Sequence, residues 1–334
     1  MGDPAGIGPE VIVGAWSDQR IHDQVRPLVL GHPEILRRAA RLLGYPVEVV
    51  EIVQPAALEE LISGPNTIRC IKACSDDVLD VRAGQVDARA GEAAFQAVQM
   101  AARLALGKKV AGIVTAPLSK SALHAAGHDY PGHTELLAKM CGVADFAMML
   151  YLPSGEAVRS HCGLGVVHVT LHQSLRSVFG DLTPDAIVAK CRLADVAMRQ
   201  LGVDYPRLAV CALNPHAGED GLFGDEERTI IAPAVNQARR SGLNVSGPYP
   251  TDTLMLRARD GEFDAVVAMY HDQGHIALKL LGMHAAVNIT LGLPIVRTSV
   301  AHGTAFDRAW QGTARCDGMV AAILTAAKLI RRGV

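Results

Sequence analysis

The sequence predicts an α/β protein whose strands form a largely parallel sheet wrapped by helices. Short apolar runs at 110–114, 208–213 and 266–269 have the continuous hydrophobicity of strands buried on both faces. They alternate with longer segments such as the Ala-rich residues 91–106, whose composition favours a helix. Regular alternation of this kind is typical of parallel sheets covered by helices.

The length, composition and charge of the chain indicate which class of ligand it binds. The chain has 334 residues, of which 49% are hydrophobic, so two domains or one large α/β domain can build a full core. A formal net charge of -2 with scattered Lys and Arg disfavours a nucleic-acid surface. No apolar run reaches the roughly 20 residues that span a membrane, and we expect neither a membrane segment nor a signal peptide. A small molecule is therefore the expected partner.

The elements follow in order. Apolar, β-branched runs predict these strands: 26–31, 47–53, 68–74, 110–114, 147–152, 166–171, 208–213 and 266–269. The runs at 147–152 and 166–171 are expected to pair antiparallel through the loop 153–165. Helices are expected from near Pro9, over 35–44 and 91–106, from Lys120, from His133, over 184–201, through Met255 and at the carboxyl end. The acidic residues 225–227 are expected at a solvated helix start.

Seven cysteines lack the spacing of a metal site, which favours reduced thiols in a cytoplasmic protein. The Gly- and Pro-rich opening, GDPAGIGPE, lacks the GxGxxG phosphate pattern, so it is either a ligand loop or a tight structural turn. Such a loop normally follows a strand. We therefore expect the natural amino terminus to lie upstream of Met1, or Met1 to be an alternative start.

Three histidines lie in or just after apolar strands: His168, His216 and His271. Ligands of open α/β sheets bind at the carboxyl ends of strands. Three neutral imidazoles with an open position describe a divalent metal site that polarises a substrate oxygen. Taken singly, each histidine can equally be a helix cap or a core residue, and no short metal motif decides between these interpretations.

An anion pocket is also possible. His133 and Thr134 begin a helix whose N–H groups could hold a phosphate or carboxylate, and Lys279 and Arg297 could add charge. The alternative for Thr134 is ordinary helix capping. Asp252 is a candidate acid or, equally, the cap of its own helix.

Six ordered motifs resemble the 4-hydroxythreonine-4-phosphate dehydrogenase family, usually called the PdxA family: GDPAGIGPE, TAPLSK, YPGHTELLA, LNPHAGEDGLFGDEE, MYHDQGH and VNITLGLPIVRTSVAHGTAFD. The resemblance covers essentially the whole chain. It implies a two-domain fold like that of isocitrate and isopropylmalate dehydrogenases, with the active site in the interdomain cleft, and a homodimer with shared active sites. We expect residues 1–135 and 285–334 to form the cofactor-side domain, and 136–284 the metal, substrate and dimerisation domain.

The resemblance also implies roles for single residues. The metal ligands are His168, His216 and His271, one of them contributed across the dimer interface. The substrate contacts are His133, Thr134, Lys279, Asn288 and Arg297. We take Lys279 and Asp252 as the candidate catalytic residues, whereas the cofactor-binding residues remain unknown.

The implied reaction oxidises a secondary alcohol with NAD or NADP and then removes carbon dioxide from the 3-keto acid. The sequence decides neither the nucleotide nor the metal, which could be Zn, Co, Mg or Mn.

His275 and the following residues resemble a catabolic branch that acts on 4-phospho-D-threonate or 4-phospho-D-erythronate. We therefore expect a phosphorylated four-carbon acid. Two alternatives stay open: a terephthalate-type cis-dihydrodiol dehydrogenase, which shares the HDQGHI string, and a non-catalytic binding protein of the same fold.

Overall fold

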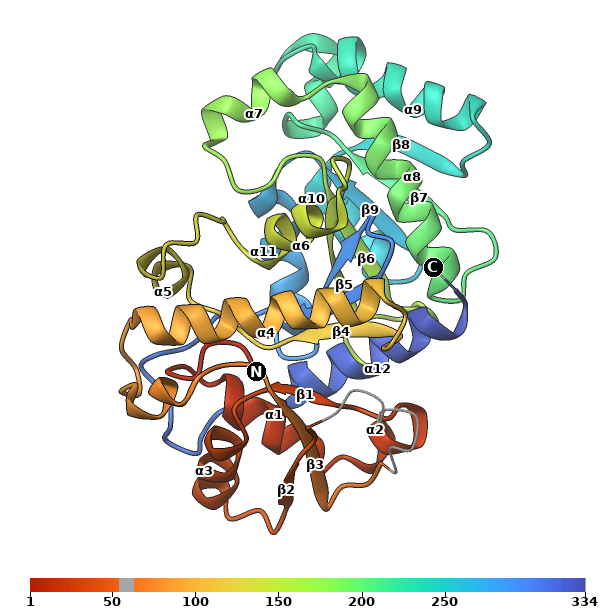
Figure 1. Cartoon of the computed structure of the whole chain (residues 1–334). Coiled ribbons are helices and arrows are strands. Elements are labelled where there is room, and N and C mark those ends of the chain that lie inside the picture. Colours follow the sequence, from red (N-terminus) through yellow and green to blue (C-terminus); the bar gives the residue numbers. More distant parts are fainter. Residues whose placement is uncertain (54–62, 334) are drawn as a thin grey trace. The chain divides into compact units, whose positions relative to one another are not determined.

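The computed structural model describes residues 1–53 and 63–333 and divides into two compact units (Figure 1). The first contains Met1–Ala144 and Leu293–Ile330, and the second contains Asp145–Gly292 and Arg331–Val334. Strands and helices alternate in both units, which confirms the predicted α/β class. The unit limits fall somewhat later in the chain than the sequence-based limits at 135 and 284.

The strands of the first unit form two parallel groups. One is a three-stranded sheet in the order β1 (Val29–Gly31), β3 (Thr67–Lys72) and β2 (Glu48–Glu51). The other is the pair of β4 (Gly112–Thr115) and β11 (Val296–Val300). The register of this pair sets Arg297 opposite Ile113, so Arg297 lies within a strand.

The helices of the first unit begin at the expected signals. Asp18, Asp87 and Ser119 each cap a helix by accepting a backbone N–H, and Pro33 stands in a first turn. The bounds are α1 Gly8–Trp16, α2 Gln19–Gln24, α3 Pro33–Leu43, η2 Asp76–Asp80, α4 Ala88–Leu106, α5 Lys120–Ala125, α6 His133–Cys141 and α12 Asp317–Arg331.

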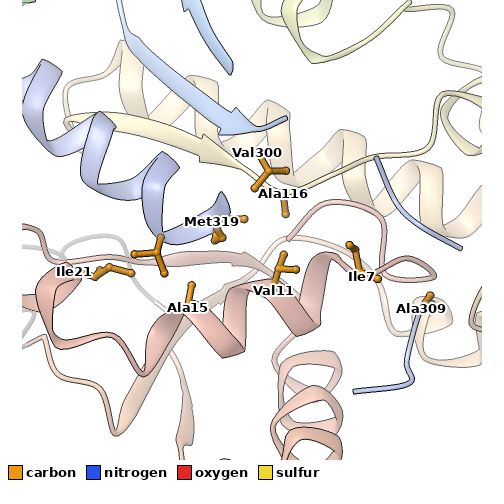
Figure 2. Packing of buried hydrophobic residues seen from close by; sticks show 9 residues of the cluster. Ile7, Val11, Ala15, Ile21, Ala116, Val300, Ala309 and Met319 are labelled. Atoms are coloured by element: carbon orange, nitrogen blue, oxygen red, sulfur yellow. The ribbon is translucent and has the colours of Figure 1, made fainter. Parts of the chain in front are cut away.

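The GDPAGIGPE stretch belongs to the core of the first unit. One face of α1 carries Val11 and Ala15, and Ile7 precedes the helix on the same side. These residues pack against Val300 and Met319 (Figure 2). The backbone N–H groups within the stretch are used inside the protein: that of Asp3 donates to Pro117 at 2.8 Å. That of Ile7 donates to Thr304 at 3.0 Å. These contacts favour the structural turn over a phosphate loop.

The strands of the second unit belong to one mixed sheet. Their order is β10 (Val287–Leu291), β5 (Ala147–Leu152), β6 (Leu164–His168), β9 (Ala265–Ala268), β7 (Leu208–Cys211) and β8 (Val245–Tyr249). β5 runs antiparallel to both β10 and β6, which confirms the predicted antiparallel pair, and the remaining pairs are parallel.

The helices of the second unit are α7 Leu175–Asp181, α8 Pro184–Gln200, η3 Pro215–Gly221, η4 Glu227–Ile231, α9 Ala232–Arg240, α10 Thr251–Arg259 and α11 His271–Gly282. An ion pair between the buried Asp264 and the exposed Arg207 fixes the start of two central strands. The Asp264 carboxylate, ahead of β9, accepts from the backbone N–H of Arg207 at 2.8 Å and from its guanidinium at 2.9 and 3.1 Å.

All seven cysteines are free thiols, as the sequence predicted, and Cys70, Cys162, Cys191 and Cys211 are buried. Among the helices of residues 1–53 and 63–333, none combines the length and the apolar character needed to cross a membrane.

Candidate active site

A cluster of histidines lies at the carboxyl ends of two neighbouring strands in the second unit. β6 and β9 run parallel, and their register sets His168 level with Ala268. Because α11 begins soon after β9, its first residue, His271, returns to the same edge of the sheet. Sheet register and a short strand-to-helix connection therefore bring together two histidines that are far apart in the sequence.

α11 adds a further imidazole to this cluster. His271, His275 and Lys279 recur every four residues, so they share one face of the helix. The rings of His271 and His275 stack with centroids 3.8 Å apart, and the His168 and His271 centroids are 6.0 Å apart. Nε2 of His168 lies 3.0 Å from Nδ1 of His275.

The inner histidines of the cluster are held neutral. Burial first, and then the neighbouring His275 and His271, lowers the pKa of His168 to about 3. Burial, with His271 and Lys279 nearby, lowers the pKa of His275 to about 3. Neutral imidazole is the form that can donate a lone pair to a metal ion.

Asp272 orients the His271 ring. Nδ1 of His271 lies 2.7 Å from Oδ1 of Asp272. Since a carboxylate can only accept, Nδ1 carries the proton and Nε2 of the neutral ring keeps its lone pair. A carboxylate behind an imidazole is the arrangement that orients histidine ligands in many metal sites.

Gly274 allows α11 to approach the sheet. A Cβ at this position would lie 2.5 Å from Cγ1 of Val166 and 2.7 Å from Nε2 of His168. Both distances are below those that real side chains tolerate. The glycine of the YHDQG motif is therefore required for the contact between α11 and His168.

We expect Gly274→Ala to lower the free energy of unfolding by up to about 2 kcal/mol, because an overpacking cost of roughly 1–3 kcal/mol is offset by only about 1 kcal/mol of helix propensity that alanine gains. Urea denaturation measures this change. The matched control is Gly180→Ala in α7, where an added Cβ meets nothing within 4 Å. Equal stability of the two variants would contradict the steric role of Gly274.

Gln273 ties the cluster to the neighbouring strand and helix. Its Oε1 accepts from the N–H of Met269 at 2.7 Å, and its Nε2 donates to Ala212 O at 2.7 Å and to Thr251 Oγ1 at 3.0 Å. One side chain thus joins the ends of β9 and β7 to the start of α10. No role for Gln273 was predicted from the sequence, although it stands among the polar residues that follow the strand at 266–269.

The third predicted ligand, His216, lies on η3. It is exposed, and its ring lies 6.2 Å from that of Phe223 by centroid distance. In the part of the chain that the structure describes, no group of three or more His, Cys, Asp or Glu residues is arranged to hold a metal ion. A single copy therefore does not assemble the three predicted ligands.

The turn that carries His216 has an unusual backbone. Left-handed values occur in succession at His216, Ala217, Gly218, Glu219 and Asp220. Each costs a non-glycine residue about 1–2 kcal/mol. Such strain persists only where surrounding contacts enforce it, and it is frequent at functional sites.

The expected solvated helix start at residues 225–227 is only partly correct. A helix starts at Glu227 and Asp225 is exposed, but Glu227 is buried and its Oε1 accepts from the N–H groups of Leu213 and Asn214, each at 2.7 Å. The end of β7 folds back onto the start of η4. This long-range contact has no signature in the local charge pattern.

The first unit contains three of the predicted binding residues, Arg297, His133 and Thr134. Arg297 is only 2% exposed, and its Nη2 donates to Thr115 Oγ1 at 2.6 Å. Burial lowers the pKa of Arg297 to about 10, and nearby Glu135 partly offsets this, so the guanidinium stays charged at neutral pH. Burial and the Arg297 charge lower the pKa of His133 well below its ordinary value.

The start of α6 has no side-chain cap. Gly132 occupies the cap position and no side chain caps the helix, so the capping alternative for Thr134 is wrong. Nε2 of His133 is buried and has no hydrogen-bond partner within the described residues. Uncapped N–H groups, a neutral imidazole and a buried guanidinium are suited to a phosphate or carboxylate.

The remaining predicted residues lie in the second unit. Lys279 is half-buried on the cluster face of α11. Asn288, on β10, donates from Nδ2 to the Met148 sulfur at 3.1 Å. Its Oδ1 is buried without a hydrogen-bond partner in residues 1–53 and 63–333. Asp252 is exposed in the first turn of α10, whose cap position is Pro250, and its Oδ1 accepts from Thr253 N at 2.8 Å.

Comparisons with known proteins agree with these features. A family model described as pyridoxal phosphate biosynthetic protein PdxA matches residues 23–326. The chain is 46% identical to the D-threonate 4-phosphate dehydrogenase of Salmonella typhimurium, over 98% of this chain and 97% of that protein.

Solved structures show the same likeness. A 4-hydroxythreonine-4-phosphate dehydrogenase from Klebsiella pneumoniae matches with a TM-score of 0.85 and 45% identity, covering 99% of this chain and 98% of that one. A terephthalate 1,2-cis-dihydrodiol dehydrogenase from Burkholderia xenovorans matches with a TM-score of 0.63 and 30% identity, covering 98% and 96%.

The chain is thus an oxidoreductase that acts on a CH–OH group, which confirms the prediction of an enzyme over a non-catalytic binding protein. More narrowly, it belongs to the PdxA family, as its motifs indicated. A nicotinamide cofactor follows from the dehydrogenase class.

Proposed function

We propose that this enzyme oxidises the secondary alcohol of a 4-phosphorylated four-carbon hydroxy acid, 4-phospho-D-threonate or 4-phospho-D-erythronate, with NAD or NADP. Decarboxylation of the resulting 3-keto acid follows. The observation that carries this proposal is the 46% identity, over 98% of the chain, to a protein named D-threonate 4-phosphate dehydrogenase. 4-Hydroxythreonine-4-phosphate, the substrate in the name of the Klebsiella relative, is the nearest alternative.

The donor set fits a divalent metal. His168 and His271 lie together, His168 is held neutral, and Asp272 leaves Nε2 of His271 with a lone pair. When bound, the metal supplies Lewis-acid polarisation of the alcohol oxygen and of the carbonyl that replaces it. Imidazole ligands suit zinc or cobalt, and magnesium or manganese are the alternatives.

We further propose a homodimer in which His216 completes the ligand set of a second copy. His216 is exposed, and within the described residues it does not form a metal-binding group of three with the other two ligands. Beside the cluster, α11 exposes an apolar stripe of Ile276, Leu280 and Met283, and Leu280 is 83% exposed. A protein surface of this kind suits contact with another chain. The free thiols are consistent with the expected cytoplasmic location.

We propose two groups of substrate-binding residues. In the first, Arg297, His133 and Thr134 supply charge and N–H donors for an anionic group. In the second, Lys279 lies next to the histidine cluster, where its ammonium can transfer a proton to or from the reacting centre. Asn288 offers a buried amide oxygen to a substrate hydroxyl.

The competing function is oxidation of a terephthalate-type dihydrodiol. This chain is 30% identical to the dihydrodiol relative, with a TM-score of 0.63. It is 45% identical to the 4-hydroxythreonine-4-phosphate dehydrogenase of Klebsiella pneumoniae, with a TM-score of 0.85. The buried Arg297 beside an uncapped helix start also favours a strongly anionic group such as phosphate.

An absorbance assay of reduced nicotinamide tests the proposal. The purified enzyme is given each phosphorylated acid, 4-hydroxythreonine-4-phosphate or the dihydrodiol, with NAD or NADP, and with or without added metal. We expect metal-dependent reduction with the phosphorylated threonate or erythronate, together with release of carbon dioxide. Turnover of the dihydrodiol alone would overturn the assignment.

We expect Arg297→Ala to raise KM for the phosphorylated substrate about 10- to 150-fold with a smaller change in kcat, because a charge-assisted hydrogen bond contributes about 1.5–3 kcal/mol. Lys279→Ala should weaken binding by a similar amount. Steady-state kinetics measure both effects, with the exposed Arg103→Ala as control. An unchanged KM in the Arg297 variant would remove this residue from the binding site.

A further inference from the structure

Glu227 holds together the segment that carries His216. Its Oε1 accepts from the backbone N–H groups of Leu213 and Asn214, each at 2.7 Å, and its Oε2 accepts from Nδ2 of Asn214 at 2.9 Å. Burial alone would raise the pKa of Glu227, but the N–H groups of Asn214 and Leu213 keep it below its ordinary value. The charge of this buried carboxylate is therefore satisfied within the protein.

The strained turn closes directly onto this carboxylate. A Cβ on Gly218, at the centre of the left-handed residues, would lie 2.8 Å from Oε2 of Glu227. A Cβ on Gly224 would lie 2.6 Å from Nδ2 of Asn214. Both glycines have positive φ, of 80° and 129°. Glu227 thus lies at the inside of the turn, while His216 lies on its exposed side.

We propose that Glu227 is a positioning residue for His216. The inference rests on the proposed function, in which His216 is a metal ligand. Glu227 itself contacts neither metal nor substrate. It holds the strained backbone between Asn214 and Gly221 in one conformation, so that the His216 imidazole is already in place when a second copy and a metal ion meet it.

Glu227→Gln tests this inference. The amide keeps the size of the side chain and one acceptor oxygen, but its NH₂ group would face Nδ2 of Asn214, which is also a donor. We expect the affinity of the metal-free enzyme for Co²⁺, measured by titration calorimetry, to fall about 10- to 100-fold, as is typical for residues that orient a ligand. Glu156→Gln, the same change at an exposed site of the same unit, is the control and should leave the affinity unchanged.

The same substitution in a His216→Ala background separates positioning from general stability. If Glu227 acts through His216, it should have no further effect on Co²⁺ affinity once that imidazole is gone. An equal loss in both backgrounds would overturn the inference, because Glu227 would then act on the fold as a whole. The midpoint of thermal unfolding is recorded for every variant.

Two other outcomes distinguish the inference from the function on which it rests. If His216→Ala weakens Co²⁺ binding but Glu227→Gln does not, positioning is overturned and the ligand assignment stands. If His216→Ala leaves the affinity unchanged, the ligand assignment fails and the inference fails with it. Should Glu227→Gln not fold, Asn214→Ala removes the side-chain hydrogen bonds to Glu227 and Glu226 while both carboxylates stay, and the same outcomes apply to it.

Discussion

Replacing His271 by alanine is expected to lower kcat/KM roughly 1,000-fold or more while leaving the fold intact. Polarisation of a substrate oxygen by a bound metal contributes several kcal/mol, and each 1.4 kcal/mol corresponds to a tenfold change in rate. The His271 side chain is 33% exposed, so its removal should change the free energy of unfolding by no more than about 1 kcal/mol.

Three measurements check this expectation: steady-state turnover, the metal content of the purified variant and its urea denaturation. His161→Ala, which removes an exposed histidine of the same unit, serves as the matched control and should retain full activity. Full turnover of the His271 variant would sink the ligand assignment. A variant that loses both metal and fold would instead give His271 a structural role.

Much of the histidine cluster could be predicted from the sequence. The apolar run at 266–269 predicts a buried strand, and the spacing of His271, His275 and Lys279 places them on one helical face. Because parallel strands end at a common edge of the sheet, His168 at the end of β6 can be expected near the end of β9. The part that could not be predicted is the register, since pairing of β6 with β9 depends on contacts about a hundred residues apart in the chain.

The burial of Glu227 and the left-handed turn at His216, neither of which was predicted, have a common physical cause. A run of acidic residues is normally solvated, and Glu227 is buried only because the end of β7 folds back onto it. The left-handed turn at His216 likewise depends on that contact and on two glycines. Local pattern shows which residues can take part in chemistry, whereas tertiary contacts decide which of them meet within one copy.

Asp3, in the GDPAGIGPE stretch, is buried. The free energy of unfolding should therefore depend on pH. Asp3 is 0% exposed, and Oδ1 accepts from the N–H of Ala5 at 2.8 Å. Burial raises the pKa of Asp3 from 3.8 to about 6, and the neighbouring Asp87 adds to this, against the opposing N–H groups of Ala5 and Ser119.

The direction of the pH dependence follows because the pKa of Asp3 is higher in the folded than in the unfolded chain. The protonated carboxyl stabilises the fold fully below pH 3.8, and this contribution is lost as the pH rises through about 6. Asp3→Asn cannot titrate. The free energy of unfolding of the variant minus that of the parent should therefore rise by about 2–3 kcal/mol between pH 4 and pH 7. Urea denaturation across this range measures the difference. Asp129→Asn, whose parent side chain is 100% exposed, should show no such slope, and parallel profiles for Asp3→Asn and the parent would contradict the argument.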